Sequence, residues 1–169
     1  MCVRRKEIEK PFTPHTLQDL RFIADAMLGR LARWMRFLGF DTLYYPDIDD
    51  SRLIRIAREQ GRFILTRDTC LIKIKGVEAC LLIKANDSFK QLLEVIDKLK
   101  LRQFNLLSRC VKCNGLLTKI LNKMEIKDSV PEFVFINFNV FLKCSDCGNI
   151  YWEGTHPSKF REKLCEILK

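Results

Sequence analysis

The first hundred residues alternate between short apolar runs and longer segments whose apolar residues repeat with helical spacing. The apolar runs predict strands at residues 21–24, 41–46, 62–66 and 78–84. The periodic segments predict helices at residues 26–38, 51–60 and 89–100, with a short helix or turn at 69–74. This alternation is typical of a mostly parallel sheet with helices on both faces, so an α/β fold is expected.

The pattern changes near residues 101–108. Helical periodicity gives way to a cysteine-containing segment, a polar stretch and the sequence PEFVFINFNVFL, in which Phe133, Phe135 and the residues after them predict extended structure. Residues 159–169 predict a closing amphipathic helix. The expected organisation is therefore a basic tail over 1–19, an α/β domain over 20–103 and a smaller module over 104–169.

Charge and composition narrow the function classes. The net charge is +9, and the excess of Lys and Arg is spread over both halves of the chain. Such a balance is compatible with a phosphate-rich partner such as RNA. No apolar run approaches the ~20 residues of a membrane helix, and the first residues lack the apolar region of a secretory signal. We therefore expect no membrane partner and a cytoplasmic location.

Four of the eight cysteines form two Cys-x-x-Cys pairs. They are Cys110, Cys113, Cys144 and Cys147. A glycine follows each pair and frees the backbone to curl around sulfur, and four sulfurs suit tetrahedral Zn²⁺ in a structural role. Iron, a redox disulfide or two unrelated pairs are the alternatives. The remaining cysteines are scattered in or beside apolar sequence, which is typical of a reduced, intracellular protein.

Acidic residues follow three of the predicted strands. Asp25 follows the first strand, Asp68 the third, and Asp47, Asp49 and Asp50 the second. Because the carboxyl ends of parallel strands form one edge, these carboxylates are expected to converge and to attract Mg²⁺ or Mn²⁺. The alternative is that each Asp caps the helix after it, as Asp50 would for residues 51–60. Asp47 and Asp49 are expected to be solvated loop residues.

Basic residues accompany this edge. Arg30, Arg33 and Arg36 step by three along the first predicted helix and form a stripe that is either a solvated face or a contact for a phosphate backbone. Arg67 is next to Asp68 and could pair with a carboxylate or a phosphate.

Several common catalytic motifs are missing. The chain contains no GxGxxG, GxxxxGK[ST], GxSxG or HExxH sequence. This disfavours dinucleotide-binding, P-loop, serine hydrolase and zincin functions.

Four segments carry a resemblance to a known family. They are DAMLGRLARWMRFLGFDT (25–42), GRFILTRD (61–68), RCVKCNG (109–115) and CSDCGNIYWEGTH (144–156). Together they resemble the Mut-seven C-terminal ribonuclease domain family, over about residues 20–160. The resemblance implies a PIN-like nuclease domain fused to a zinc ribbon. Such a domain uses clustered acidic residues and Mg²⁺ or Mn²⁺ to cut single-stranded RNA.

The resemblance also implies site residues. It carries the acidic positions onto Asp25, Asp50 and Asp68, with Asp49 as the alternative to Asp50. Many PIN nucleases have a fourth acidic residue shortly after the Thr-x-Asp, where this chain has Cys70 and Leu71. PIN domains often dimerise, so a homodimer or a regulatory protein partner is compatible with the resemblance.

The resulting hypothesis is a divalent-metal-dependent ribonuclease. Asp25, Asp50 and Asp68 would hold the catalytic metal, Arg30, Arg33 and Arg67 would position RNA, and the zinc ribbon would assist binding. Two alternatives remain open: a non-catalytic RNA- or ribosome-binding module, and a scaffold whose acidic edge is occupied by a partner protein.

Overall fold

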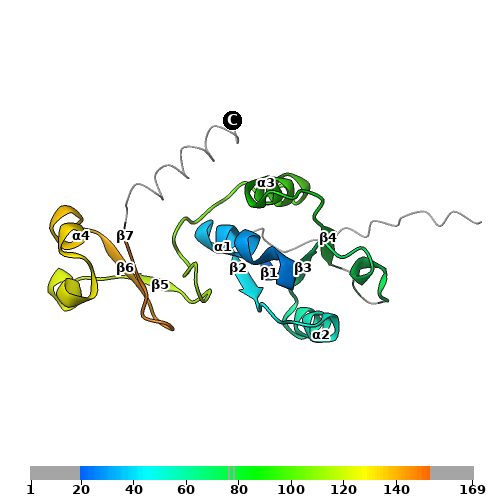
Figure 1. Ribbon diagram of the computed structural model, residues 1–169, viewed down its shortest axis with the longest axis horizontal. Coiled ribbons are helices and arrows are strands. Elements are labelled where there is room, and N and C mark those ends of the chain that lie inside the picture. The colour runs from blue at the N-terminus through cyan, green and yellow to red at the C-terminus, as the bar shows by residue number, and fades with distance from the viewer. Residues whose placement is uncertain (1–19, 76, 78, 153–169) are drawn as a thin grey trace, which may run out of the picture. The chain divides into compact units, whose positions relative to one another are not determined.

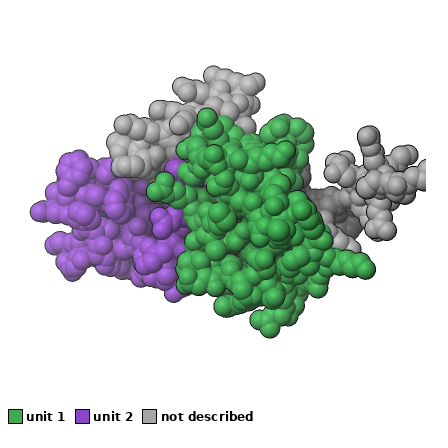
Figure 2. All heavy atoms as spheres, turned by 45° about the vertical axis from the view of Figure 1, so that its right-hand side comes forward, with its two compact units in different colours: residues 1–32, 42–103 green, residues 33–41, 104–169 purple. Residues whose placement is uncertain are grey.

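The structure is a computed structural model that describes residues 20–75, 77 and 79–152, and it divides into two compact units (Figure 2). The first unit comprises residues 1–32 and 42–103, and the second comprises residues 33–41 and 104–169. The predicted tail over 1–19 and the predicted helix over 159–169 lie outside the described residues. Among the described helices, none has the length and apolarity needed to cross a bilayer.

The first unit contains a four-stranded sheet in the order β2-β1-β3-β4 (Figure 1). Its strands are β1 (Arg21–Ala24), β2 (Asp41–Tyr44), β3 (Phe63–Thr66) and β4 (Cys80–Leu82). β3 runs parallel to both β1 and β4. All four residues of β3 are buried, as expected for a central strand covered on both faces. The α/β prediction is confirmed.

Helices cover both faces of this sheet. The short η2 (Ala26–Leu28) leads into α1 (Gly29–Phe37), and α2 (Asp50–Gln60), η3 (Leu71–Lys73) and α3 (Ser88–Lys98) follow along the chain. α2 and α3 lie on opposite faces of the sheet (Figure 1). α2 buries Leu53, Ile54 and Ala57 in a core that includes Ile23 and Ile64 of the neighbouring strands. These apolar positions recur at helical spacing, which explains why the segment forms a helix against the sheet.

Two helices begin one residue before the predicted start. Asp49, not Asp50, caps α2, because its Oδ1 accepts a hydrogen bond from the Arg52 N–H at 2.9 Å. Asp87, not Ser88, caps α3, with its Oδ1 accepting from the Phe89 and Lys90 N–H groups. In each case two good capping residues are adjacent in sequence, and the first of them takes the position.

The second unit contains a three-stranded antiparallel sheet in the order β5-β6-β7. Its strands are β5 (Leu117–Lys119), β6 (Phe141–Cys144) and β7 (Ile150–Trp152). Between β5 and β6 the chain forms η4 (Lys123–Ser129) and α4 (Glu132–Asn137). Two Cys-x-x-Cys turns on an antiparallel sheet match the predicted ribbon layout.

The prediction of extended structure is wrong for Phe133 and Phe135, because residues 132–137 are helical, but it is confirmed farther along, where Phe141–Cys144 form β6. Val130 and Val134 are buried four residues apart, and Phe138 packs beside them against Phe141. Val134 lies inside the helix, whereas Val130 and Phe138 flank it in extended backbone. Packing of this short segment on the cluster outweighs the preference of its aromatic and β-branched residues for strands.

Candidate active site and metal centre

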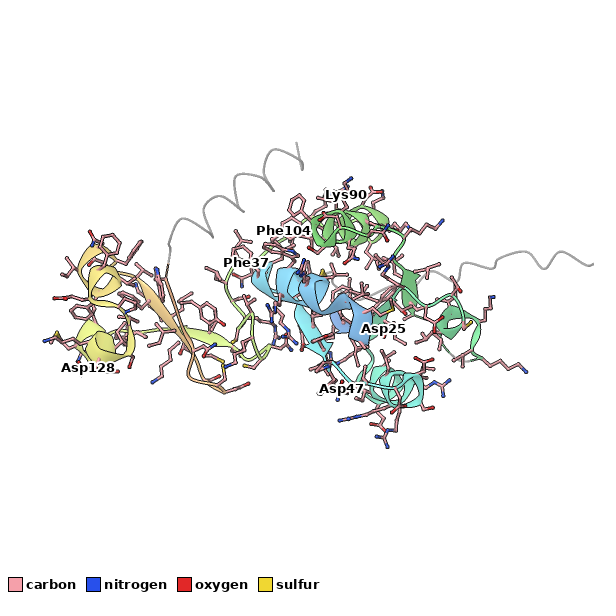
Figure 3. The ribbon with its side chains drawn as sticks, in the orientation of Figure 1. Asp25, Phe37, Asp47, Lys90, Phe104 and Asp128 are labelled. Carbon is pink, nitrogen blue, oxygen red and sulfur yellow. The ribbon has the colours of Figure 1, made fainter. Side chains whose placement is uncertain are left out.

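Asp25 and Asp68 lie at the same edge of the parallel sheet. β1 and β3 are hydrogen-bonded neighbours, with Ala24 opposite Leu65, so the chain leaves both strands at one end. The Asp25 N–H donates to the Leu65 carbonyl oxygen at 2.9 Å, which extends the pairing to Asp25 itself. Figure 3 shows Asp25 at the start of the α1 segment and Asp47 in the connection that precedes α2.

One hydroxyl group links the two acidic positions. Thr66 Oγ1 donates to Asp25 Oδ2 at 2.7 Å and accepts from the Asp68 N–H at 2.9 Å. Asp25 is 7% exposed and Thr66 is fully buried. The Asp25 side chain makes no capping hydrogen bond to the helix that follows it. The capping alternative for Asp25 is therefore wrong, and its carboxyl group is oriented by Thr66 instead.

Asp68 and Asp50 complete the acidic edge. Asp68 Oδ1 accepts a hydrogen bond from the Cys70 N–H at 2.6 Å, which tightens the loop after β3. Asp50 is the first residue of α2 and is exposed. Desolvation raises the pKa of Asp50, and so do the negative charges of Asp68, Asp25 and Asp49. The predicted carboxylates are therefore close enough to act on one another electrostatically.

The spacing of these carboxylates limits how a metal could be held. Within the described part of the chain, the four cysteines are the group of three or more potential ligands whose ligand atoms all lie within 4.8 Å of one another. Asp25, Asp50 and Asp68 do not form such a group, so their carboxylate oxygens do not all lie within 4.8 Å of one another. Mg²⁺ commonly keeps several water ligands and takes only one or two carboxylates directly, so the acidic edge fits a hydrated divalent cation.

The arginines of the predicted stripe differ in environment. Arg30 and Arg33 are exposed, whereas Arg36 is only 4% exposed. The prediction of one continuous basic stripe is therefore wrong at Arg36, whose Nη1 donates to the carbonyl oxygens of Val111 and Lys112. Arg67, half-buried, donates from Nη2 to Asn86 Oδ1.

A groove beside α2 was not predicted from the sequence. It has a volume of about 520 Å³, and its lining includes Ser51, the residue after Asp50. It is lined by Ser51, Ile54, Arg55, Arg58, Glu59, Ile74 and Lys75. Three of these residues are cationic and one is anionic. The spacing of Arg55 and Arg58 on one helix was the signal that the sequence offered, but Lys75 joins them only through the fold.

The four cysteines of the second unit converge on one point. Cys110 Sγ lies 3.5 Å from Cys147 Sγ, and Cys113 Sγ lies 3.4 Å from Cys144 Sγ. All four sulfurs lie within 4.8 Å of one another. Zn–S bonds of about 2.3 Å in a tetrahedron place sulfurs about 3.8 Å apart, so this donor set fits Zn²⁺ with four protein ligands.

Tyr151 joins this cluster, a contact that the sequence did not reveal. Its Oη lies 3.0 Å from Cys110 Sγ. Burial opposes ionisation of the Cys110 thiol, but hydrogen bonds from Tyr151, from the Cys113 N–H and from the neighbouring thiols outweigh it and lower the pKa of Cys110 to about 6. Burial and the hydrogen bond to Cys110 raise the pKa of Tyr151 to about 12. Tyr151 therefore contacts the metal cluster and packs within the ribbon.

The two cysteine turns use glycine differently. Gly148 follows the second pair with φ of +72°, the left-handed conformation that glycine favours. In the first turn Asn114 adopts the left-handed conformation, with φ of +75°. Gly115 is required there for close approach, since a Cβ would collide with the Asp146 carboxylate and lie 3.0 Å from Cys144 Sγ.

Comparisons with known proteins find a family match that covers both the acidic edge and the four cysteines. The family model of the Mut7-C RNAse domain matches residues 20–164 of the chain. A human protein named exonuclease mut-7 homolog is 32% identical over 102 residues, which cover 56% of this chain. The chain spans only 12% of the length of that relative. No solved structure matches the chain.

Proposed function

Since the chain belongs to the Mut7-C RNAse domain family, we propose that it is a divalent-metal-dependent ribonuclease acting at the acidic edge of its parallel sheet. The observation that supports this most directly is the Thr66 hydroxyl group, which fixes the Asp25 carboxyl group and the Asp68 backbone together. A fold that needed these residues only as helix caps would not require that link.

Asp25, Asp50 and Asp68 would hold the Mg²⁺ or Mn²⁺ ion. A bound divalent cation supplies charge neutralisation at the phosphate and lowers the pKa of a coordinated water. Desolvation raises the pKa of Asp50, and the negative charges of Asp68, Asp25 and Asp49 raise it further. The negative charge gathered at this edge favours a cation. Thr66 orients Asp25, and the Cys70 N–H orients Asp68, so two of the three carboxylates are held before a cation arrives.

The chain's arginines would position a single-stranded RNA. Arg30 and Arg33 are exposed on α1, and Arg67 lies next to Asp68. The groove beside α2 adds Arg55, Arg58 and Lys75, whose positive charges suit a phosphate backbone. The four-cysteine centre would be structural, since four protein ligands leave no open position for water, and the ribbon would assist RNA binding.

The test is cleavage of labelled single-stranded RNA by the full chain with Mg²⁺, with Mn²⁺ and with EDTA. Asp68→Asn is expected to lower cleavage at least about 100-fold, the scale for losing one group that stabilises a transition state. Asp47→Asn is the matched control, because Asp47 is an exposed loop carboxylate between β2 and α2. Blocking either RNA end separates endonucleolytic from exonucleolytic cutting.

Two outcomes would contradict the proposal. Cleavage that survives both EDTA and Asp68→Asn would remove the acidic edge from the reaction. Tight RNA binding without cutting under any metal would favour a non-catalytic RNA-binding module, in which the carboxylates are structural.

A further inference from the structure

Arg36 is a buried cation next to the first cysteine turn. It lies on the part of α1 that belongs to the second unit and is 4% exposed. Its Nη1 donates to the Val111 carbonyl oxygen at 3.2 Å and to the Lys112 carbonyl oxygen at 2.8 Å. Val111 and Lys112 are the two residues between Cys110 and Cys113, so Arg36 holds the backbone of the turn that presents two of the four sulfurs.

The hydrogen bond from Arg36 to the Lys112 carbonyl oxygen is linked to Cys110 Sγ through one peptide group. The Lys112 carbonyl and the Cys113 N–H belong to the same peptide, and in a trans peptide they point in opposite directions. The carbonyl oxygen faces the Arg36 guanidinium, and the Cys113 N–H donates to Cys110 Sγ at 3.5 Å. Arg36 therefore aims and polarises an amide dipole whose positive end faces a ligand sulfur.

Asp41 fixes the same turn from its other end. Its Oδ1 accepts from Asn114 Nδ2 at 2.8 Å, and its Oδ2 lies 3.5 Å from Arg109 Nη2. Arg109 Nη1 in turn donates to the Asn114 carbonyl oxygen at 3.0 Å. Asn114 is buried and left-handed, so this support keeps a strained residue in the conformation that closes the turn.

We propose that Arg36 is a positioning residue of the four-cysteine metal centre, which it supports by orienting the Cys110–Cys113 turn and by offsetting the thiolate charge. This inference rests on the proposed zinc site. Four thiolates and Zn²⁺ carry a formal charge of about −2, and a guanidinium stays protonated at any physiological pH. Outer groups of this kind commonly change metal affinity 10- to 100-fold.

The test measures metal affinity of the full chain, by competition with a chromogenic chelator and by Co²⁺ titration. Arg36→Met is expected to weaken Zn²⁺ binding 10- to 100-fold and to shift the sulfur-to-cobalt charge-transfer band, which reports electron density on the thiolates. Arg36→Lys keeps the charge but loses the planar fork, so an intermediate effect is expected. Lys127→Met is the control, because Lys127 is an exposed cation of η4 in the same unit and should leave metal affinity unchanged.

The possible outcomes distinguish a failure of the Arg36 proposal from a failure of the proposed zinc site on which it rests. If the unaltered protein binds neither Zn²⁺ nor Co²⁺ through thiolates, the zinc site itself is wrong and the role of Arg36 falls with it. If the unaltered protein binds one ion and Arg36→Met binds it equally well with the same spectrum, the positioning role alone is overturned. If Arg36→Met does not fold, two other variants decide: Arg36→Lys keeps the charge and loses the planar fork, and Arg36→Gln loses the charge and keeps a side-chain donor. Wild-type affinity and spectrum in both variants would overturn the positioning role.

Discussion

The four cysteine sulfurs and the three carboxylates differ in how closely the fold brings them together. The four sulfurs all lie within 4.8 Å of one another, whereas the oxygens of Asp25, Asp50 and Asp68 do not form such a close group, and the charges of Asp25 and Asp68 act on Asp50. A thiol cluster can keep most of its protons until a metal arrives, because the pKa of Cys110 is lowered while those of Cys113 and Cys147 are raised. Carboxylates that are all ionised repel at short range. The ribbon therefore gathers its ligands closely, whereas the acidic edge orients Asp25 and Asp68 with separate hydrogen-bond partners.

Removing one ligand of the proposed zinc site is the strongest way to test this contrast. Cys144→Ser removes a buried ligand and should abolish structural metal binding, whose contribution in small zinc modules is on the order of 10 kcal/mol. Thermal unfolding and the zinc content of the purified protein measure the effect. Cys70→Ser changes an exposed free cysteine and should behave like the unaltered protein. A Cys144→Ser protein that keeps one zinc and melts normally would mean that the cluster holds no structural metal.

Thr66→Val tests whether the acidic edge is built before a cation binds. The replacement keeps the shape of the side chain but deprives Asp25 of a donor and the Asp68 N–H of an acceptor. We expect a loss of about 1–3 kcal/mol in the free energy of unfolding, measured with urea, because buried polar groups lose their partners. Thr66→Ser keeps the hydroxyl group and should recover most of the loss. Equal stability of the valine and serine variants would show that the hydroxyl group contributes nothing.

Asp50→Asn should have the smallest effect. A carboxyl group whose pKa is raised by folding binds its proton more tightly in the folded state, so it stabilises the fold at low pH and destabilises it as the pH rises above the ordinary pKa. In EDTA near pH 7, Asp50→Asn should therefore raise the free energy of unfolding slightly, by about 0.5 kcal/mol or less for an exposed side chain.

The pH and cation dependence of this small gain sharpen the test. The gain should vanish near pH 3, and Mg²⁺ should stabilise the unaltered protein more than the variant. Asp47→Asn, in the preceding loop, should show neither effect. A gain that persists at low pH would point to a cause other than charge repulsion.

The pattern of apolar and polar residues predicted most of the strands and helices of the first unit. Apolar runs located β1 and β3, and helical spacing located α1 and α2, because both signals arise within a few neighbouring residues. Two caps were placed one residue late, since adjacent residues in each case were acceptable caps. α4 was missed because only the fold reveals that Val130 and Val134 face Phe141.

The candidate site was predictable in composition but not in contacts. Cysteine spacing indicated the metal cluster, and two strand–Asp junctions indicated a shared edge. The Thr66 link depends on which strands are neighbours, and the burial of Arg36 depends on a turn more than seventy positions later. Contacts between such distant positions leave no periodic trace in the chain, so a stripe of arginines looked uniform although its last member is buried.

The division of the second unit between residues 33–41 and residues beyond 103 has a consequence for the order of synthesis. The segment that contains Arg36 and Asp41 leaves the ribosome well before the cysteine turns that it contacts. At about 5–20 residues per second, the delay is on the order of ten seconds. During that time the buried arginine has none of its later carbonyl partners, and a chain that stopped after residue 103 would never acquire them.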